Sequence, residues 1–436
     1  MKMNRSTKRF SIILLMIFIV LLFNTTTYAY WASNVLGSNQ NSNQSLSIGE
    51  WDYVTSLPAG VVLYVSGNTY SESIVVYHEG NFFITTKQTS SNDYPGKGTP
   101  YNAPFFQLSL EYKGFNYYVL NNVVYHEQTE AYYIAKPHNP NGYQPNTNST
   151  WHRLGTIDYD QYMHFPVNSI ARHNNQYYLR IVADNDHGVE PNFSNSAQWR
   201  ALENQHLWKP VIYPTTHTYV LHNGSVYRNQ WYASASNVPG AHNVWELISS
   251  NPLWNASETY QVGQIVKDED DHFYRLLDAS LASTKPGEVK GAWQRVDTLD
   301  YIENNNYKIH EIVIYQNKVY QVVNETNANN SLPGAIKNAW NQLDTLNYVE
   351  TNSYELHDVV IIDDAVYQVV DAERANQNAP GDAQNAWNRL GIIDYQWYNV
   401  YKQDSVVFYN HTAYRALTEV TNVIPGTDST KWQSLT

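Results

Sequence analysis

The sequence contains no cysteine among its 436 residues. This absence excludes disulfide bonds and thiolate chemistry, although small exported domains commonly rely on disulfides to support a thin core. Stability must therefore come from packing. Aromatic residues are abundant, with 37 tyrosines, 13 tryptophans and 12 phenylalanines, and each buried Trp or Tyr removes roughly 150–250 Å² from water.

Positive charge is scarce as well, with 27 Lys and Arg against 40 Asp and Glu. A chain of net charge −13 lacks the basic surface that nucleic acids and anionic lipids attract, so neither is an expected partner. The acidic balance suits a neutral or cationic target. No segment beyond the N-terminal region is apolar enough to span a membrane.

Residues 1–29 have the pattern of an export signal. Four basic residues precede an almost unbroken apolar run at 11–23, and Thr27-Tyr28-Ala29 offers a small residue for cleavage. The run is shorter than the ~20 residues that span a bilayer. We predict an extracellular or cell-surface protein with no membrane segment after signal removal. A retained N-terminal anchor is the alternative.

A repeat organises the rest of the chain. Tryptophan followed by leucine or a close equivalent recurs at intervals of 48, 46, 48, 47, 47 and 45 residues. The series comprises Trp151, Trp199, Trp245, Trp293, Trp340, Trp387 and Trp432. Phe106 with Leu108 extends it backwards, which gives eight units.

Each unit has the same internal order. Most open with two aromatic residues six positions apart, as in Tyr301 and Tyr307. Two β-branched strands joined by a short polar turn follow, then a Pro-Gly or Pro-Asn turn, then the closing Trp. The pattern predicts an all-β fold, a tandem array of about eight small three-stranded antiparallel β-modules of ~47 residues each.

The predicted boundaries follow the repeat. A signal peptide at 1–29 and an N-terminal linker or short strand region at 30–62 precede module 1 (63–109), module 2 (110–155), module 3 (156–204), module 4 (205–249), module 5 (250–297), module 6 (298–344), module 7 (345–391) and module 8 (392–436).

The motif resembles the carbohydrate-binding modules of families 5 and 12, which bind chitin and cellulose. Module 5 carries the resemblance most completely, in Trp254, Tyr260, Gly263, Val266, Phe273-Tyr274, Pro286-Gly287 and Trp293. The resemblance covers about 63–436. It implies core roles for the closing Trp and the hairpin Tyr, and sugar binding by exposed aromatic residues.

The resemblance also implies particular carbohydrate-binding residues. Tyr143 stands in the Gly-aromatic-x-Pro sequence of module 2, and Trp231-Tyr232 forms the family's Trp-Tyr pair in module 4. Trp208 and Trp254 match an opening Trp that belongs to the family's sugar face. For each ring, core or inter-module packing is the alternative. Modules 5–8 have no aromatic residue before the Pro turn.

The N-terminal region has a second resemblance. Tyr28-Ala29-Tyr30-Trp31-Ala32-Ser33 and Ser47-Ile48-Gly49-Glu50-Trp51 are similar to the start of Firmicutes surface and biofilm-matrix proteins. It implies a Gram-positive-type envelope or matrix.

Two sets of polar residues are candidates for metal sites. The first is a histidine series that follows the first strand of modules 1–4, comprising His78, His126, His173 and His222. The second is the acidic run 268–271. Neither has the spacing of a metal site, so we interpret both as turn residues and expect no metal or cofactor. No stretch outside the repeat is long enough for a catalytic domain, so we expect no enzyme.

We therefore expect a secreted, non-catalytic protein that binds a polysaccharide, chitin or another β-linked cell-wall or matrix glycan. Aromatic rings stack on the apolar face of a pyranose, and repetition adds avidity. The alternative is a structural surface or matrix protein whose modules are spacers or self-associate.

Overall fold

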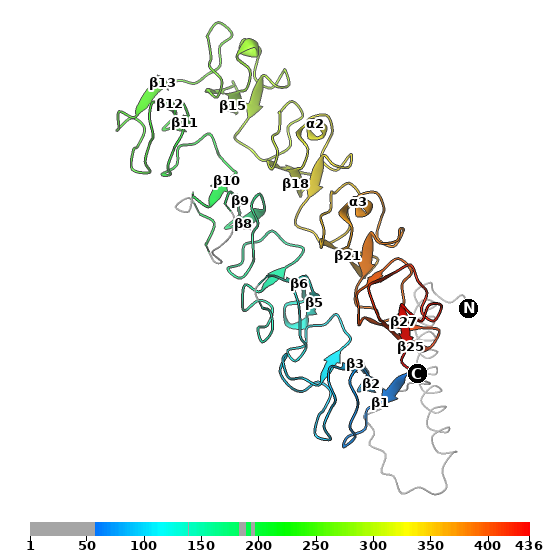
Figure 1. The fold of residues 1–436 in the computed structure, drawn as a ribbon. Helices are drawn as coiled ribbons and strands as arrows, with labels where there is room; N and C mark the ends of the chain where they lie inside the picture. The colour runs from blue at the N-terminus through cyan, green and yellow to red at the C-terminus, as the bar shows by residue number, and fades with distance from the viewer. Residues whose placement is uncertain (1–56, 138, 183–188, 193–196) are drawn as a thin grey trace, which may run out of the picture. The chain divides into compact units, whose positions relative to one another are not determined.

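The computed structural model describes residues 57–137, 139–182, 189–192 and 197–436. This part of the chain is nearly all β and forms eight small sheets in tandem (Figure 1), as the repeat predicts. The predicted export signal and the N-terminal resemblance lie outside the described residues. We use module 1 to module 8 for the eight sheets with their loops.

Each module contains a β-hairpin and a third antiparallel strand that begins at or beside the closing aromatic residue. In chain order the strands are β1 (Val61–Leu63), β2 (Val75–His78), β3 (Asn81–Thr85) and β4 (Phe105–Gln107) in module 1; β5 (Val123–His126), β6 (Ala131–Ala135) and β7 (Trp151–Arg153) in module 2; β8 (Ile170–His173), β9 (Gln176–Arg180) and β10 (Trp199–Ala201) in module 3; and β11 (Tyr219–His222), β12 (Ser225–Asn229) and β13 (Trp245–Ser249) in module 4.

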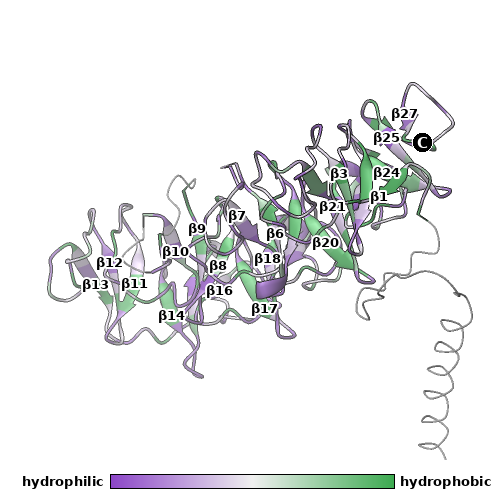
Figure 2. Ribbon diagram, turned by 90° about the horizontal axis from the view of Figure 1, so that it is seen from below, coloured by the Kyte–Doolittle hydropathy of each residue, from purple (hydrophilic) through white to green (hydrophobic). Residues whose placement is uncertain are grey.

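The later modules repeat this order. Their strands are β14 (Ile265–Lys267), β15 (Phe273–Leu276) and β16 (Trp293–Arg295) in module 5; β17 (Ile312–Tyr315), β18 (Lys318–Val322) and β19 (Trp340–Gln342) in module 6; β20 (Val359–Ile362), β21 (Ala365–Val369) and β22 (Trp387–Arg389) in module 7; and β24 (Val406–Tyr409), β25 (Thr412–Ala416) and β27 (Trp432–Ser434) in module 8, which also contains the pair β23 (Val400–Tyr401) and β26 (Val420–Thr421). Figure 2 shows hydrophobic residues concentrated in the strands.

Three features depart from the predicted three-stranded unit, one of them the extra pair β23 and β26 of module 8. In module 1 the sheet has a fourth strand, because β1 pairs in parallel with β2. Within the described residues, four short helical turns also occur in the loops, namely η1 (Glu127–Thr129), η3 (Ala279–Leu281), α2 (Glu325–Ala328) and α3 (Ala372–Ala375). The strand periodicity carried no signal for these turns.

The hairpin turns explain the polar residues between the strands. In module 6, Gln316 and Asn317 both have positive φ, 51° and 60°. A two-residue turn of this kind matches the right-handed twist of the strands and favours Asn, Asp and Gly. The same conformation occurs at Asp363-Asp364 and Asn410-His411.

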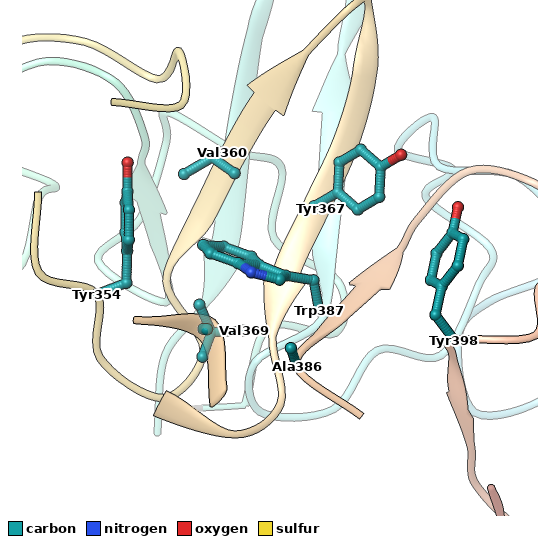
Figure 3. Packing of buried hydrophobic residues seen from close by; sticks show 8 residues of the cluster. Tyr354, Val360, Tyr367, Val369, Ala386, Trp387 and Tyr398 are labelled. Carbon is teal, nitrogen blue, oxygen red and sulfur yellow. The ribbon is translucent and has the colours of Figure 1, made fainter. Parts of the chain in front are cut away.

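The core of each module is built around its closing tryptophan (Figure 3). In module 7, Trp387 is fully buried and its ring lies edge-on to Tyr354, with 5.1 Å between ring centroids. Val360 and Val369 complete the packing. At about 25 cal/mol per Å² of buried apolar surface, burying such a ring stabilises the folded state by several kcal/mol. This figure does not include the conformational entropy lost on folding.

The aromatic pair six residues apart also has a polar function. The phenol oxygen of Tyr354 accepts a hydrogen bond from the backbone N–H of Val349, one residue after the opening Tyr348, at 2.7 Å. The same bond joins Tyr307 to Ile302 and Tyr118 to Lys113. The second ring therefore fills the core and also satisfies a loop donor.

Module 1 corrects one prediction from the repeat. Phe105, not Phe106, occupies the position of the closing tryptophan, since Phe105 is fully buried and pairs with Thr85 as Trp151 pairs with Ala135. Phe106 is only half-buried. The sequence alone does not show which of the two adjacent phenylalanines replaces the closing tryptophan. Neighbouring side chains of a strand point to opposite faces, so only one of the two rings can enter the core.

In several modules a buried asparagine side chain hydrogen-bonds to the backbone of the preceding module. We call this interaction the asparagine clip. The side chain of Asn305 in module 6 accepts the backbone N–H of Arg295 at 2.8 Å and donates to its carbonyl at 3.1 Å. Arg295 is the last residue of the closing strand of module 5. The side-chain amide of Asn305 therefore pairs with both backbone polar groups of Arg295, as a neighbouring strand would. Asn116, Asn352 and Asn399 make the same pair of bonds in modules 2, 7 and 8.

The modules also pair across the chain, 1 with 8, 2 with 7, 3 with 6 and 4 with 5. The side chain of Gln368 in module 7 donates to the carbonyl of Asn121 in module 2 at 3.0 Å. Gln321 donates in the same way to Asn168, 153 residues away, at 2.9 Å. We call modules 1–4 the first row and modules 5–8 the return row (Figure 1).

Apolar clusters fill the contacts between the two rows. Ile170 and Leu179 of module 3 pack with Ile312 and Val319 of module 6. Val123 with Val359, Val75 with Phe408, and Leu221 with Ile265 belong to the corresponding clusters of the other three pairs. One face of each hairpin covers the core of its own module, and the other face is covered by the paired module.

Candidate carbohydrate-binding surface

The loop before the turn proline has a fixed backbone in every module with a closing Trp. The indole N–H donates to the carbonyl of the residue two positions before the proline. These bonds are Trp151 to Tyr143, Trp199 to Val189, Trp245 to Asn237, Trp293 to Thr284, Trp340 to Ser331, Trp387 to Asn378 and Trp432 to Val423, at 2.7–3.3 Å. The side chain at this position differs between modules while its backbone is held in the same way.

Tyr143 is the aromatic residue at this position in module 2. Its carbonyl accepts from Trp151 Nε1 at 2.9 Å and from Tyr112 Oη at 3.1 Å, while its own side chain is 50% exposed. A rigid backbone with a projecting ring presents a flat apolar surface without the entropy cost of ordering a loop. The structure thus places Tyr143 where a ligand can reach it.

Trp231 and Tyr232 form the second exposed site, in module 4. Each side chain is 56% exposed. The fully buried Asn229 donates to the carbonyl of Trp231 at 3.0 Å, and Ala233 forms a backbone bridge with Tyr213. Both flanks of the aromatic pair are therefore anchored in the module, although the rings face solvent.

Trp208 and Trp254 lie differently. Both are half-buried and pack against the cores of modules 4 and 5. The Trp208 ring lies edge-on to His222 at 5.0 Å, and Trp254 Nε1 donates to the carbonyl of Ala282 at 3.3 Å. These two rings offer a ligand only part of their surface.

Among the residues that the structure describes, three further exposed aromatic side chains were not predicted from the sequence. They are Tyr101, Tyr117 and Trp397, at 59%, 49% and 47% exposure. Tyr117 stands beside the second ring of the aromatic pair, Tyr118, and Trp397 stands beside the buried Tyr398. For Tyr117 and Trp397 a buried tyrosine stands next in sequence, so the sequence alone does not show which of the two adjacent rings is exposed.

Helical turns replace the aromatic loops in modules 5–7. Each turn begins at a polar residue whose side chain caps it, Asp278, Asn324 or Asp371. An alanine at or near its end, Ala282, Ala328 or Ala375, is buried in the cluster of the closing tryptophan. The loops that lack aromatic residues in modules 5–7 therefore form capped helical turns where modules 2 and 4 have exposed rings.

The histidine series has a packing role. His78, His126, His173 and His222 are the last residues of their strands, not turn residues as we predicted. Each ring stands edge-on to the opening aromatic ring of its module, at 4.8–5.8 Å between centroids. Tyr315 and Tyr409 take the same place in modules 6 and 8, and Ile362 takes it in module 7, so the position serves packing around the opening ring.

The acidic run forms the longer hairpin turn of module 5. Ligand atoms of Asp268, Asp270 and His272 lie within 4.8 Å of one another. Partial burial opposes ionisation of Asp268, but the N–H groups of His272 and Asp270 bond to its carboxylate and lower its pKa overall. The side chains of this cluster therefore lie close together because hydrogen bonds within the turn hold them there.

One acid of the return row with a raised pKa lies away from the aromatic loops. Burial raises the pKa of Glu311, which lines the junction of modules 3, 5 and 6 near Arg275. Its carboxylate accepts the backbone N–H of Lys308 at 2.9 Å. Glu311 contributes to the packing between modules and has no geometric link to the exposed rings.

The chain matches no known protein-family model and no curated protein. The resemblance to carbohydrate-binding modules therefore depends on the residues named above. In the part of the chain that the structure describes, no helix has the length and apolar character needed to cross a membrane.

Proposed function

We propose that this protein binds a polysaccharide through Tyr143, Trp231 and Tyr232. One observation carries the proposal: these large rings are at least half exposed on loops whose backbones are fixed by buried side chains. Aromatic rings held in this way cover the C–H face of a pyranose, and nearby polar groups bond its hydroxyls. The target is chitin or another β-linked, uncharged glycan.

Avidity is part of the proposal. One aromatic platform contributes roughly 0.5–1.5 kcal/mol beyond area burial, so a single site binds weakly. Sites held on one polymer gain about 10²–10⁴ in overall affinity when geometry permits simultaneous contact. Modules 2 and 4 belong to one packed row. No flexible linker between them therefore lowers the effective concentration of the second site.

We also propose that the protein acts outside the cell, at the surface or in an extracellular matrix, and has no catalytic activity. The N-terminal basic and apolar pattern supports export. N-terminal sequencing of the protein recovered from the medium tests this proposal. A start near residue 30 supports cleavage, and a chain found only inside the cell with residues 1–29 intact contradicts it.

The test of binding is retention of the intact chain on insoluble chitin, cellulose and isolated cell wall, at low and high salt. Retention on at least one matrix that persists at high salt is expected, since stacking is not ionic. Replacing Tyr143, Trp231 and Tyr232 by alanine should weaken retention without changing Tm. Lack of retention on every matrix contradicts the proposal.

A structural matrix protein is the second candidate, favoured by the capped turns of modules 5–7. Its modules would be spacers or self-associate. The pairing of the two rows weighs against self-association through the hairpin faces, because those faces are already covered within the chain. Light scattering that rises with concentration in the absence of glycan would favour this candidate.

A further inference from the structure

A cavity of about 340 Å³ lies between module 1 and module 2. Phe105, fully buried, and Phe115, half-buried, line its inner part. The exposed rings of Tyr101 and Tyr117 line its outer part, one from each module. The volume falls in the range of small-ligand sites, which are mainly apolar with few polar groups.

The two tyrosines are held in a defined arrangement. Their ring centroids are 5.7 Å apart and the rings are inclined by 68°, so they present surfaces of different orientation. The side chain of Asn139 hydrogen-bonds to the phenol oxygen of Tyr101. Asn139 belongs to the loop that carries Tyr143, so the cavity adjoins the region proposed to bind glycan.

The relative position of the two modules is fixed beside this cavity. Asn116, between Phe115 and Tyr117 in sequence, accepts the backbone N–H of Gln107 at 2.9 Å and donates to its carbonyl at 3.0 Å. Both bonds are buried. These bonds fix the cavity-lining residues of module 2 relative to those of module 1. The cavity is therefore preorganised for a rigid ligand.

We infer that this cavity is an inter-module subsite for one pyranose unit of an uncharged polysaccharide. The occupant follows from the chemistry: aromatic surfaces suit the C–H face of the sugar, and the phenol groups of Tyr101 and Tyr117 with the hydroxyl of Thr86, which also lines the cavity, suit its hydroxyls. The acidic chain disfavours a polyanion. The inference rests on the proposed function and adds a subsite that neither module forms alone.

A local probe tests the subsite in the full chain. Because the chain has no cysteine, Gln88→Cys places one environment-sensitive dye on an exposed residue next to the cavity-lining Lys87. The titrant is a hexamer of β-1,4-linked N-acetylglucosamine. A saturable signal is expected, weakened about tenfold by Tyr101→Ala with Tyr117→Ala, since both stacking surfaces are then removed.

Two controls separate the possible outcomes. Leu120→Ala removes an exposed apolar side chain of module 2 outside the cavity lining and should leave the titration unchanged. Trp231→Ala with Tyr232→Ala should lower polymer retention but keep the dye signal. An unlabelled Tyr101→Ala, Tyr117→Ala chain guards against interference by the dye and should show weaker retention on insoluble chitin.

The result that overturns the subsite differs from failure of the proposed function. If the intact chain is retained on polymer but neither the dye signal nor retention depends on Tyr101 and Tyr117, the subsite is wrong and glycan binding stands. If no glycan is bound by any measure, both fail. If the double variant changes only sedimentation, the cavity is a contact between copies and the inference is overturned.

Discussion

At the residue scale, the same residue type occupies two opposite environments in this chain. Trp340 is fully buried and its indole N–H fixes the loop carbonyl of Ser331, whereas Trp231 is mostly solvent-exposed on an anchored loop. The repeat identified Trp340 as core because it recurs at the same place in every later module. Position within the module therefore separates buried from exposed tryptophans better than residue type does.

Replacing these two tryptophans should have contrasting effects. Trp340→Ala should destabilise module 6 by about 3–5 kcal/mol, because it leaves a cavity at the centre of the core. Trp231→Ala should change stability by at most about 0.5 kcal/mol, as is usual for an exposed side chain. Thermal unfolding of both variants checks the contrast, and equal losses of stability would contradict the assignment of Trp231 as exposed.

His152 gives the molecule a predicted response to acid. It lies half-buried between modules 2 and 3, and its Nδ1 accepts the backbone N–H of His164 at 3.3 Å, which requires the neutral form at that nitrogen. Burial, with the nearby Lys136 and His164 adding to it, lowers the pKa of His152 to about 3. The unfolded chain takes up this proton near pH 6.5, so the folded state loses stability progressively from there down to about pH 3.

Thermal unfolding at pH 7.5 and pH 5.0 tests the role of His152. His152→Asn retains an acceptor near the position of Nδ1 but cannot be protonated in this range. Its Tm should fall less on acidification than that of the unmodified chain. An identical fall in both proteins would show that His152 does not contribute.

At the element scale, the asparagine clip is the main device that the sequence did not reveal. The period of the tryptophans predicted the modules, the hairpins and the core. The clip depends on an amide reaching back to the preceding module, and asparagines are common in these loops for other reasons. Once the structure is known, the signal is plain: Asn116, Asn305, Asn352 and Asn399 each stand four residues after the opening tyrosine.

Asn305→Ala should loosen the junction of modules 5 and 6. It leaves the backbone N–H and carbonyl of Arg295 without their partner, which costs about 1–3 kcal/mol for a buried group. Amide hydrogen exchange at Arg295 should become faster, while exchange in the core of module 2 stays unchanged. Glu303→Ala, an exposed residue of the same turn, is the matched control, and equal acceleration in both variants would contradict the clip.

At the scale of the whole described chain, the pairing of the two rows could not be predicted from the repeat. Gln321, Gln368 and Arg415 hold equivalent places 47 residues apart, and each bonds to a module far away in sequence. Local patterns specify which face of a hairpin is apolar but not which distant module covers it. The exposed rings Tyr101, Tyr117 and Trp397 were missed for a related reason, since burial depends on neighbours that the sequence does not name.

The pairing of modules 1 and 8 predicts a short distance between residues at opposite ends of the array. Glu72 and Gln433 line one cavity at this contact, and Arg415 bonds to Ser73 across 342 residues at 2.7 Å. Spin labels on Glu72→Cys and Gln433→Cys should give one short, narrow distance in the native protein. A broad, long distribution like that of the urea-unfolded control would contradict the paired rows.

We propose that exposed rings on anchored loops of the first row bind the glycan. Binding isotherms on insoluble chitin test it with two matched triple variants. Tyr143, Trp231 and Tyr232 replaced by alanine should lower affinity at least about tenfold. Thr284, Ser331 and Asn378 hold the anchored loop position in the return row, and their replacement by alanine should leave affinity unchanged. Equal binding by both variants, or none by the intact chain, would contradict the account.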